Sequence, residues 1–302
     1  MSDAASVSER AAAWGYLSAW RGVGWLPEHR ALALFGRLAD RLHARDGRGV
    51  QMLRANLAVV RPDLHGAELE DLVHDAMRSY LRYWAEAFRL PRWPLDDLVA
   101  RTVTVEEHRL RAPYDAGMGV VAVLPHQGNW DWAGAWACGT GMPLLTVAER
   151  LRPERLYDEF VAFREGLGMR ILPLTGGDDP TPQLEEWLRA GGFVCLLADR
   201  HLGGASVDVQ LCGRSVRLPV GPALLAQRTG ADLVPTTTAY DGLRLRITFH
   251  DTVDVPAAGG DLRAPTQAVA DAFTAALRAD PQDWHMMQRV FPDVVPLARG
   301  AA

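Results

Sequence analysis

The arrangement best suited to chemistry is a histidine followed five residues later by an aspartate. His126 and Asp131 belong to the segment His-Gln-Gly-Asn-Trp-Asp, which directly follows an apolar, β-branched run. Gly128 permits a sharp turn from strand to helix, and Asn129 or Asp131 can cap the N–H groups that begin the helix. A carboxylate on this turn can bind one imidazole nitrogen and leave the other free to take a proton from a hydroxyl. Taken alone, so short a pattern occurs by chance in many chains, and a structural role at a strand end explains it better.

Several other kinds of chemistry are excluded by the sequence. There is no Gly-x-Ser-x-Gly segment, and lysine is absent, so neither a Schiff base nor a P-loop lysine is available. Cys138, Cys195 and Cys212 form no Cys-x-x-Cys pair, and no His-x-x-His or His-Glu-x-x-His segment occurs, so no metal site is predicted. His126 is therefore expected to act directly on an acceptor substrate.

The pattern of apolar residues predicts an α/β fold with a mostly parallel central sheet and a helical N-terminal layer. The first hundred residues indicate helices over 5–20, 28–45, 49–60 and 67–90, the last ended by Pro91. Strands are then expected to alternate with helices, the strands over 119–126, 143–149, 169–174, 192–199, 207–211, 231–240 and 243–250, and the helices over 129–137, 153–166, 181–190, 221–230 and 265–279. One domain is predicted, with a helical layer over 1–100 and a catalytic core over 101–290.

Functional side chains gather at the carboxyl ends of the strands in such a sheet. His126, Glu149 and Asp199 each end or follow a predicted strand, so we expect them to lie near one another.

Composition limits the partners and the location of the protein. The 302 residues are 48% hydrophobic and 23% charged, with a net charge of −5 from 32 Lys+Arg and 37 Asp+Glu, which is typical of a soluble protein and disfavours nucleic acid as a partner. The first residues lack a signal peptide's basic and apolar regions, and no apolar run is long enough to span a membrane. Together with unpaired cysteines, this predicts a cytoplasmic protein.

Aromatic residues near the N-terminus favour a helix lying on a membrane surface, or equally a helix packed on the core: Trp14, Tyr16, Trp20 and Trp25, with Arg21 and Arg30 nearby.

The segment Leu-Pro-His-Gln-Gly-Asn-Trp-Asp-Trp-Ala-Gly (124–134) resembles the glycerolipid-type acyltransferases. It is more similar to the bacterial lauroyl and myristoyl acyltransferases of lipid A synthesis, and most similar to actinobacterial members that act on phosphatidylinositol mannosides. Further blocks agree in order and spacing, at 83–91, 146–151, 170–177, 195–200, 218–235 and 283–288. The resemblance covers roughly 70–290 and implies an α/β sandwich.

The resemblance implies that a fatty acyl group, palmitoyl for the mannoside enzymes, passes from acyl-CoA to a sugar hydroxyl without an acyl-enzyme or a cofactor. His126 matches the family's base and Asp131 its motif acid. Asp199 matches an acid that can orient the base, where the mannoside enzymes carry the longer Glu. The oxyanion is expected to bind a backbone N–H near Gly128, or an Arg.

The same resemblance implies which residues contact the substrates. Glu149 is expected to bind sugar hydroxyls, and Arg164 to hold a phosphate or pair with Glu149. Arg200 is expected to meet phosphates of coenzyme A or of the lipid head group. The remaining expected substrate contacts come from the turn itself: Gln127, Gly128 and Asn129.

Two alternatives remain open. The acceptor can be a lipid A-type or another glycolipid, or the protein can be a non-catalytic lipid carrier on the same fold. The carrier is favoured if neither Asp131 nor Asp199 approaches His126. The preferred location is the cytoplasmic face of the plasma membrane, as a peripheral enzyme that binds a phosphatidylinositol mannoside.

Overall fold

The central strand β2 (Val120–Leu124) is buried along its whole length in the computed structural model, which describes residues 22–150 and 154–300. Val121 and Val123 face one hydrophobic core, and the other three side chains of the strand face a second core. Since successive side chains of a strand point to opposite faces, a strand that is apolar throughout needs cover on both sides of its sheet.

Strand β2 lies inside a sheet with the order β1-β9-β8-β2-β5-β3-β4. Neighbouring strands are parallel, except for the antiparallel pair β8 and β9. β6 and β7 form a separate antiparallel hairpin. The predicted α/β class with a mostly parallel sheet is thus confirmed. The other strands are β1 (Thr102–Val105), β3 (Leu144–Ala148), β4 (Arg170–Pro173), β5 (Phe193–Leu197), β6 (Ser206–Leu211), β7 (Arg214–Pro219), β8 (Asp232–Asp241) and β9 (Arg244–Phe249).

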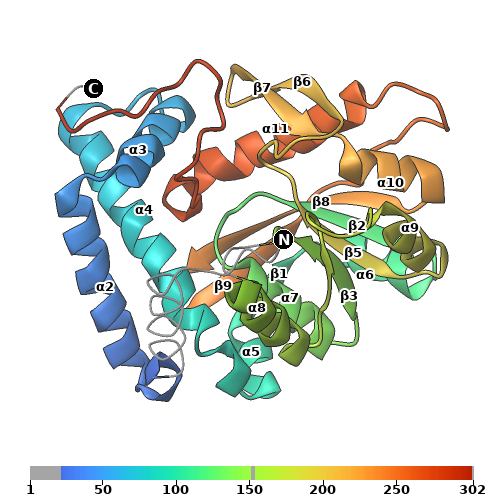
Figure 1. The fold of residues 1–302 in the computed structure, drawn as a ribbon, viewed down its shortest axis with the longest axis horizontal. Helices are drawn as coiled ribbons and strands as arrows, with labels where there is room; N and C mark the ends of the chain where they lie inside the picture. The colour runs from blue at the N-terminus through green and yellow to red at the C-terminus, as the bar shows by residue number, and fades with distance from the viewer. Residues whose placement is uncertain (1–21, 151–153, 301–302) are drawn as a thin grey trace, which may run out of the picture.

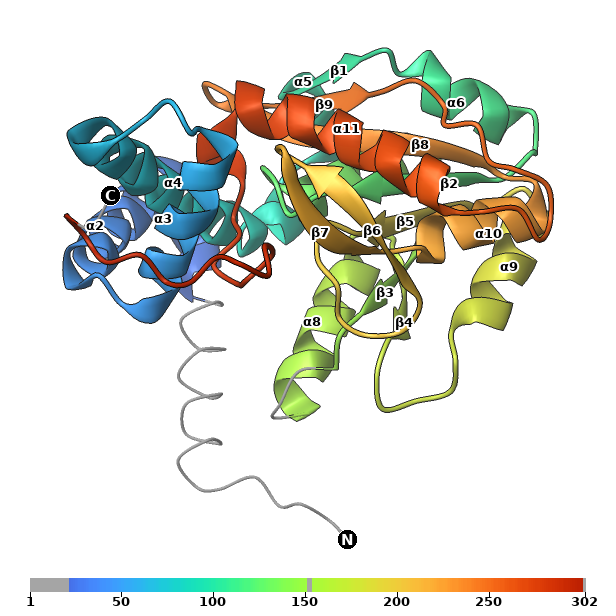
Figure 2. The same ribbon diagram turned by 90° about the horizontal axis from the view of Figure 1, so that it is seen from above.

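Helices cover both faces of this sheet (Figures 1 and 2). The core on the Val121 side is completed by α9 (Thr181–Arg189), α10 (Gly221–Thr229), α11 (Arg263–Ala279) and the β6–β7 hairpin. The core on the other side is completed by α5 (Leu95–Ala100), α6 (His108–Asp115), α7 (Trp130–Gly139) and α8 (Glu154–Gly166).

The N-terminal helices form a layer beside the sheet (Figure 1). This layer consists of α2 (Glu28–Arg45), α3 (Arg48–Val60) and α4 (Gly66–Ala87). The C-terminal end of the chain returns to it, because the buried guanidinium of Arg54 donates a 2.7 Å hydrogen bond to the carbonyl oxygen of Leu297. The predicted helical layer is confirmed over the described residues, and the helix expected over 5–20 lies outside them.

The differences from the predicted elements lie in short or irregular segments. α4 ends at Ala87, and Pro91 lies in a following 3-10 helix, Leu90–Arg92, so the expected single helix to residue 90 is wrong at its end. Sequence analysis also missed α5, β1, α6 and β7, each of which has at most eight residues. Among the described helices, none combines the length and the apolar character needed to cross a bilayer.

Candidate active site

Three adjacent strands bring the predicted polar residues to one edge of the sheet. β5 lies between β2 and β3, and all three run parallel. His126 follows the end of β2, Asp199 follows the end of β5, and Glu149 follows the end of β3. The three side chains therefore come from neighbouring strand ends, as expected.

The turn after β2 has a fixed shape. Gly128 has a φ of +60°, and a Cβ at this position would lie 2.6 Å from Oγ1 and 2.7 Å from the carbonyl oxygen of Thr238. Only glycine fits there. Asn129 caps α7, since its Oδ1 accepts a 3.0 Å hydrogen bond from the backbone N–H of Trp132. The N–H of Gly128 donates to the carbonyl oxygen of Asp283 at 2.8 Å, so this N–H is already bonded within the protein.

Asp199 is the carboxylate that orients His126. One of its oxygens lies 2.5 Å from Nδ1 of His126, and the other accepts the backbone N–H of His126 at 2.9 Å. The indole N–H of Trp284 donates to that second oxygen, also at 2.9 Å. The shorter side chain of aspartate thus reaches the imidazole at this position.

The environment of Asp199 keeps it ionised although it is fully buried. Burial opposes its charge, but attraction to the imidazole of His126 and the hydrogen bonds from His126 and Trp284 outweigh burial and lower the pKa of Asp199. Because an ionised carboxylate only accepts hydrogen bonds, the hydrogen of the neutral imidazole lies on Nδ1. Nε2 is then the nitrogen left to accept a proton from a substrate.

Asp131 does not orient His126, although the motif offered it as a candidate partner. It accepts hydrogen bonds of 2.7 Å from the hydroxyl of Tyr83 and 2.7 Å from Nε of Arg164. Burial disfavours the charge on Arg164, yet the nearby Asp131 outweighs burial and raises the pKa of the guanidinium. Asp131 and Arg164 therefore form a buried ion pair, and the expected pairing of Arg164 with Glu149 is wrong.

Two side chains of the turn point away from the substrate-accessible site. Gln127 is buried, its Nε2 lies 3.2 Å from the carbonyl oxygen of Asp280, and it lines a separate cavity of about 230 Å³ beside α11. Asn129 is also buried, and its Nδ2 donates to Glu86 at 3.0 Å. The expectation that Gln127 and Asn129 bind substrate finds no support in this arrangement, because both side chains lie outside the lining of the cavity that contains His126.

The His126 cavity has a volume of about 340 Å³. Its lining includes apolar side chains, among them Val147, Phe160 and Ile171, and polar side chains, among them His126 and His285. The other polar residues of the lining are Glu149, Arg164, Arg200 and Gln288. A cavity lined by both kinds of side chain suits an amphiphilic substrate.

Glu149 and Arg200 meet at this cavity. Their side chains form an ion pair of 3.2 Å, and Arg200 also donates to the side-chain oxygen of Gln288. The side chains of Arg200 and Arg164 are both 18% exposed, but Arg164 is paired with the buried Asp131, whereas Glu149, the partner of Arg200, is itself 47% exposed. Arg200 is therefore the better placed of the two arginines to meet a substrate anion.

Sequence analysis gave no role to Trp284 and His285, although both lie in the family-like block at 283–288. Trp284 contacts Asp199, and His285 lines the cavity. Burial, and then the proximity of His126, lowers the pKa of His285 to about 3, so this imidazole is neutral. Its Nε2 lies 3.0 Å from the hydroxyl of Ser79. The position of that block in the family pattern was the available signal, but the pattern did not show which side chains face the site.

A histidine held by a carboxylate at the strand ends of an α/β sheet, beside a cavity lined by both apolar and polar side chains, fits the site of an acyltransferase. Sequence comparison agrees, since residues 2–292 match the bacterial lipid A biosynthesis acyltransferase family. The chain belongs to this family, and the predicted enzyme class, an O-acyltransferase, is confirmed.

Curated relatives give a closer comparison. The chain is 42% identical over 275 residues to the phosphatidylinositol mannoside acyltransferase of Mycolicibacterium smegmatis. The aligned residues cover 91% of this chain and 89% of the relative. It is also 42% identical over 287 residues to the phosphatidylinositol mannoside acyltransferase of Mycobacterium tuberculosis, covering 94% of this chain and 89% of the relative.

Proposed function

We propose that this enzyme transfers a palmitoyl group from acyl-CoA to a mannose hydroxyl of a phosphatidylinositol mannoside. The acceptor follows from the names of the relatives at 42% identity over most of both chains. The single structural observation that supports the chemistry is the short contact between His126 Nδ1 and the buried carboxylate of Asp199.

The reaction needs one base and no covalent enzyme intermediate. Nε2 of His126 takes the proton of the acceptor hydroxyl while the oxygen of that hydroxyl bonds to the thioester carbonyl carbon. The carbon–sulfur bond then breaks, and the imidazolium returns its proton to the thiolate of coenzyme A. Asp199 stabilises the imidazolium between these two steps, and Arg200, which lines the cavity, is the donor that we assign to the oxyanion.

The two kinds of lining residue suggest how the substrates bind. The apolar lining residues Val147, Phe160 and Ile171 suit contact with the acyl chain, and the carboxylate of Glu149 suits mannose hydroxyls. Glu149 is 47% exposed in its ion pair with Arg200, so a sugar hydroxyl can donate to the remaining lone pairs of the carboxylate. The other N–H groups of Arg200 can then meet a phosphate or the oxyanion.

The lipid-carrier alternative is disfavoured by the same geometry. A carrier has no need of a buried carboxylate that fixes the tautomer of a cavity histidine, and the contact of Asp199 with His126 removes the condition that would favour it. A lipid A-type acceptor is kept as an outcome of the experiment below.

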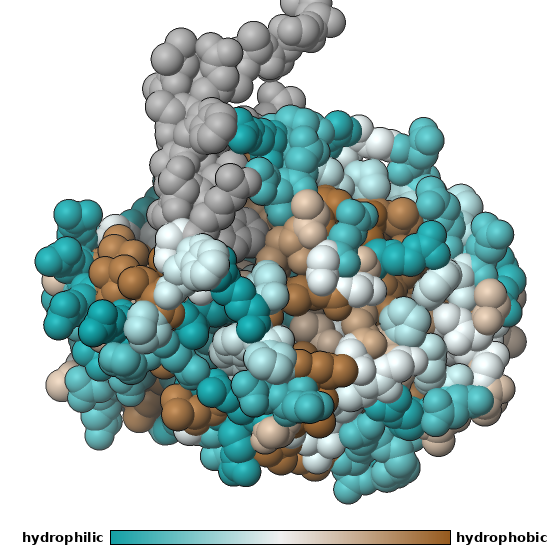
Figure 3. Space-filling view, turned by 90° about the horizontal axis from the view of Figure 1, so that it is seen from below, coloured by the Kyte–Doolittle hydropathy of each residue, from teal (hydrophilic) through white to brown (hydrophobic). Residues whose placement is uncertain are grey.

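Attachment to the cytoplasmic surface of the plasma membrane is also proposed. Hydrophobic residues lie among hydrophilic ones on the face shown in Figure 3. Trp25 is 77% exposed just before α2, and Leu34 and Leu38 on α2 are 47% and 41% exposed. Trp14, Tyr16 and Trp20, which complete the predicted interfacial segment, lie outside the described residues. Exposed aromatic and leucine side chains favour an interfacial location over a buried one.

An assay of purified enzyme tests the proposal. Palmitoyl-CoA is supplied with a monomannosylated phosphatidylinositol, with a glucosamine-based lipid A precursor, or with no acceptor, and both free coenzyme A and acylated lipid are measured. Acylation of the mannolipid alone supports the proposal. Acylation of the glucosamine lipid alone, or lipid binding without release of coenzyme A, contradicts the proposed acceptor or the proposed reaction respectively.

A further inference from the structure

We infer that Trp284 is a positioning residue for the reaction, because its indole N–H holds the carboxylate of Asp199 in the orientation that fixes His126. This inference rests on the proposed function. Trp284 lies 85 residues after Asp199 in the chain and belongs to neither of the strands that pair with β5. Its side chain is absent from the lining of the His126 cavity, so it acts through Asp199 and not on a substrate.

The carboxylate of Asp199 is oriented by three donors. His126 supplies two of them, its Nδ1 and its backbone N–H, and Trp284 supplies the third. The imidazole is the group to be oriented, so His126 cannot by itself fix the position of the carboxylate. Of these three donors, only the indole N–H of Trp284 comes from a residue other than His126. Its indole N–H shares the Oδ2 atom with the backbone of His126, and this leaves Oδ1 directed at the imidazole.

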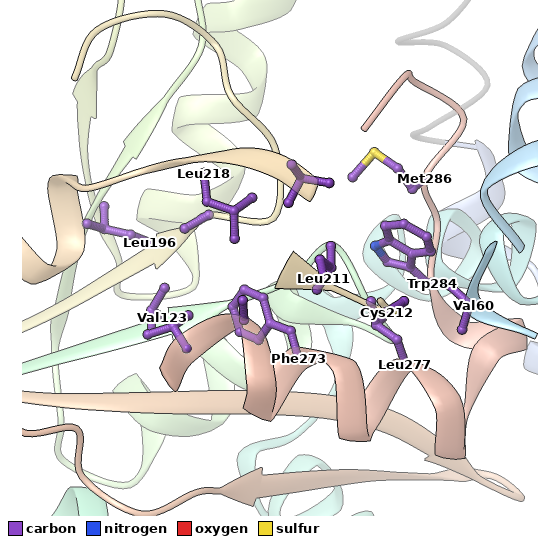
Figure 4. Close-up of a cluster of buried hydrophobic side chains, with 14 of the residues drawn as sticks. Val60, Val123, Leu196, Leu211, Cys212, Leu218, Phe273, Leu277, Trp284 and Met286 are labelled. Atoms are coloured by element: carbon purple, nitrogen blue, oxygen red, sulfur yellow. The ribbon is translucent and has the colours of Figure 1, made fainter. Parts of the chain in front are cut away.

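The indole itself is rigidly placed. Trp284 is fully buried, and its ring packs edge-on against Phe291 with the centroids 6.3 Å apart. Figure 4 shows Trp284 beside Met286, with Cys212 and Leu277 close to it. A side chain confined in this way by close packing cannot easily change its rotamer.

The backbone around Trp284 is joined to the catalytic turn. Trp284 pairs with Gln127 in an antiparallel bridge, and the N–H of His285 donates to the carbonyl oxygen of His126 at 2.9 Å. With the bond from Gly128 to the carbonyl oxygen of Asp283, these contacts tie both strands of the bridge together. The indole, the imidazole and the turn therefore keep a fixed relative position.

The helical layer anchors this bridge from the other side. The hydroxyl of Ser79 on α4 donates to Asp283 at 2.6 Å, and the buried amide of Asn56 on α3 donates to the carbonyl oxygens of Met286 and Gln288, both at 2.8 Å. The segment that carries Trp284 is thus held at both ends, which a donor to a catalytic carboxylate requires.

Loss of the indole N–H should reduce catalysis more than substrate binding. A buried carboxylate that loses a charge-assisted hydrogen bond rotates or takes up a proton more readily. The free energy of such a bond corresponds to a change in rate of about 10- to 100-fold. We expect Trp284→Phe to lower kcat by this factor and leave the KM for both substrates within about twofold.

A double-mutant cycle with Asp199→Asn separates positioning from a general structural effect. If Trp284 acts through Asp199, Trp284→Phe has little further effect on kcat once Asp199 is replaced. Trp187→Phe is the matched control, because Trp187 on α9 also donates its indole N–H, to the carbonyl oxygen of Phe193 at 3.0 Å. Neither residue belongs to the lining of the His126 cavity. Equal effects of Trp284→Phe in both backgrounds would overturn the inference, as would an unchanged kcat.

Two further measurements keep the test decisive. If Trp284→Phe does not fold, site-specific replacement of the indole of Trp284 by benzothiophene removes the N–H and keeps the shape of the ring. The proton on Nδ1 of His126 is followed by NMR in every variant, since a strong bond to a carboxylate moves its signal far downfield. Loss or upfield movement of this signal in the Trp284 variants, but not in Trp187→Phe, is expected. An inactive wild type contradicts the proposed function, whereas an unchanged NMR signal contradicts the role of Trp284.

Discussion

Replacement of Asp199 by asparagine tests whether the carboxylate sets the tautomer of His126. In the wild type, Oδ1 accepts from Nδ1 of His126, and Oδ2 accepts from the backbone of His126 and from Trp284. An amide offers only one accepting atom. Its oxygen is expected to take the position with two donors, which turns its NH₂ group toward Nδ1.

The magnitude follows from that rearrangement. When an NH₂ group donates to Nδ1, the hydrogen of the neutral imidazole moves to Nε2, and the nitrogen that faces the substrate can no longer accept a proton. Loss of general base catalysis is worth about 10²- to 10⁴-fold, and the wrong tautomer places a comparable variant at the upper end of this range. We therefore expect Asp199→Asn to lower kcat by about 10⁴-fold with little change in KM.

The assay is release of coenzyme A from palmitoyl-CoA in the presence of the mannolipid, measured under saturating conditions. Asp208→Asn on the exposed side of β6 serves as the control, since it makes the same chemical change away from the cavity. A melting temperature of Asp199→Asn close to that of the wild type shows that the fold is intact. A kcat for Asp199→Asn within threefold of the wild type would refute the assigned role of this carboxylate.

Three further changes probe the surroundings of the site. Arg164→Leu leaves the buried charge of Asp131 without its partner, so we expect the free energy of unfolding in urea to fall by about 3–5 kcal/mol; a loss below 1 kcal/mol contradicts a buried pair. Gly128→Ala forces a Cβ into β8 at a positive φ, so we expect the free energy of unfolding to fall by at least about 2 kcal/mol and most of the activity to be lost. Thermal melting and turnover measurements check this, and wild-type values would show that the turn tolerates a side chain. Burial raises the pKa of Asp283 to about 6 and lowers the pKa of His285 to about 3, so between about pH 4 and 6 acidification stabilises the fold through Asp283 and destabilises it through His285. Asp283→Asn removes the stabilising part, and unfolding free energies measured across this range should then fall by about 1.4 kcal/mol per pH unit more steeply than in the wild type; parallel curves would contradict this assignment.

The parts of the fold that sequence predicted well are those with long or strongly apolar patterns. β2 is apolar at every position, and α2 and α3 begin and end within one residue of the predicted limits. β1 has only the four residues Thr102–Val105 and half-buried side chains, so it carries too weak a pattern to be recognised. Its place at the sheet edge depends on pairing with β9, which is distant in the chain.

The candidate site was predicted in its positions more than in its contacts. The rule that strand ends meet placed His126 and Asp199 together, although 73 residues separate them. The choice between Asp131 and Asp199 as partner of His126 could not be made from the motif, because it depends on the direction in which α7 turns the Asp131 side chain. Arg164, 33 residues further along, takes that carboxylate in the folded protein.

Gln127 shows why neighbours in a motif need not share a function. It follows His126 directly, but successive residues of an extended segment point to opposite sides, and its side chain therefore lies toward α11. Trp284 shows the reverse case, since no local pattern links an indole to a carboxylate that lies 85 residues earlier in the chain. Both facts depend on tertiary packing.

The most direct test of the central claim compares the wild type with His126→Ala, using mass spectrometry of the lipid products after incubation with palmitoyl-CoA and the monomannosylated phosphatidylinositol. If the imidazole held by Asp199 is the base, the wild type forms palmitoylated mannolipid and His126→Ala forms at least 100-fold less while keeping the same melting temperature. Product formation by a folded His126→Ala variant at a rate near that of the wild type would contradict the account.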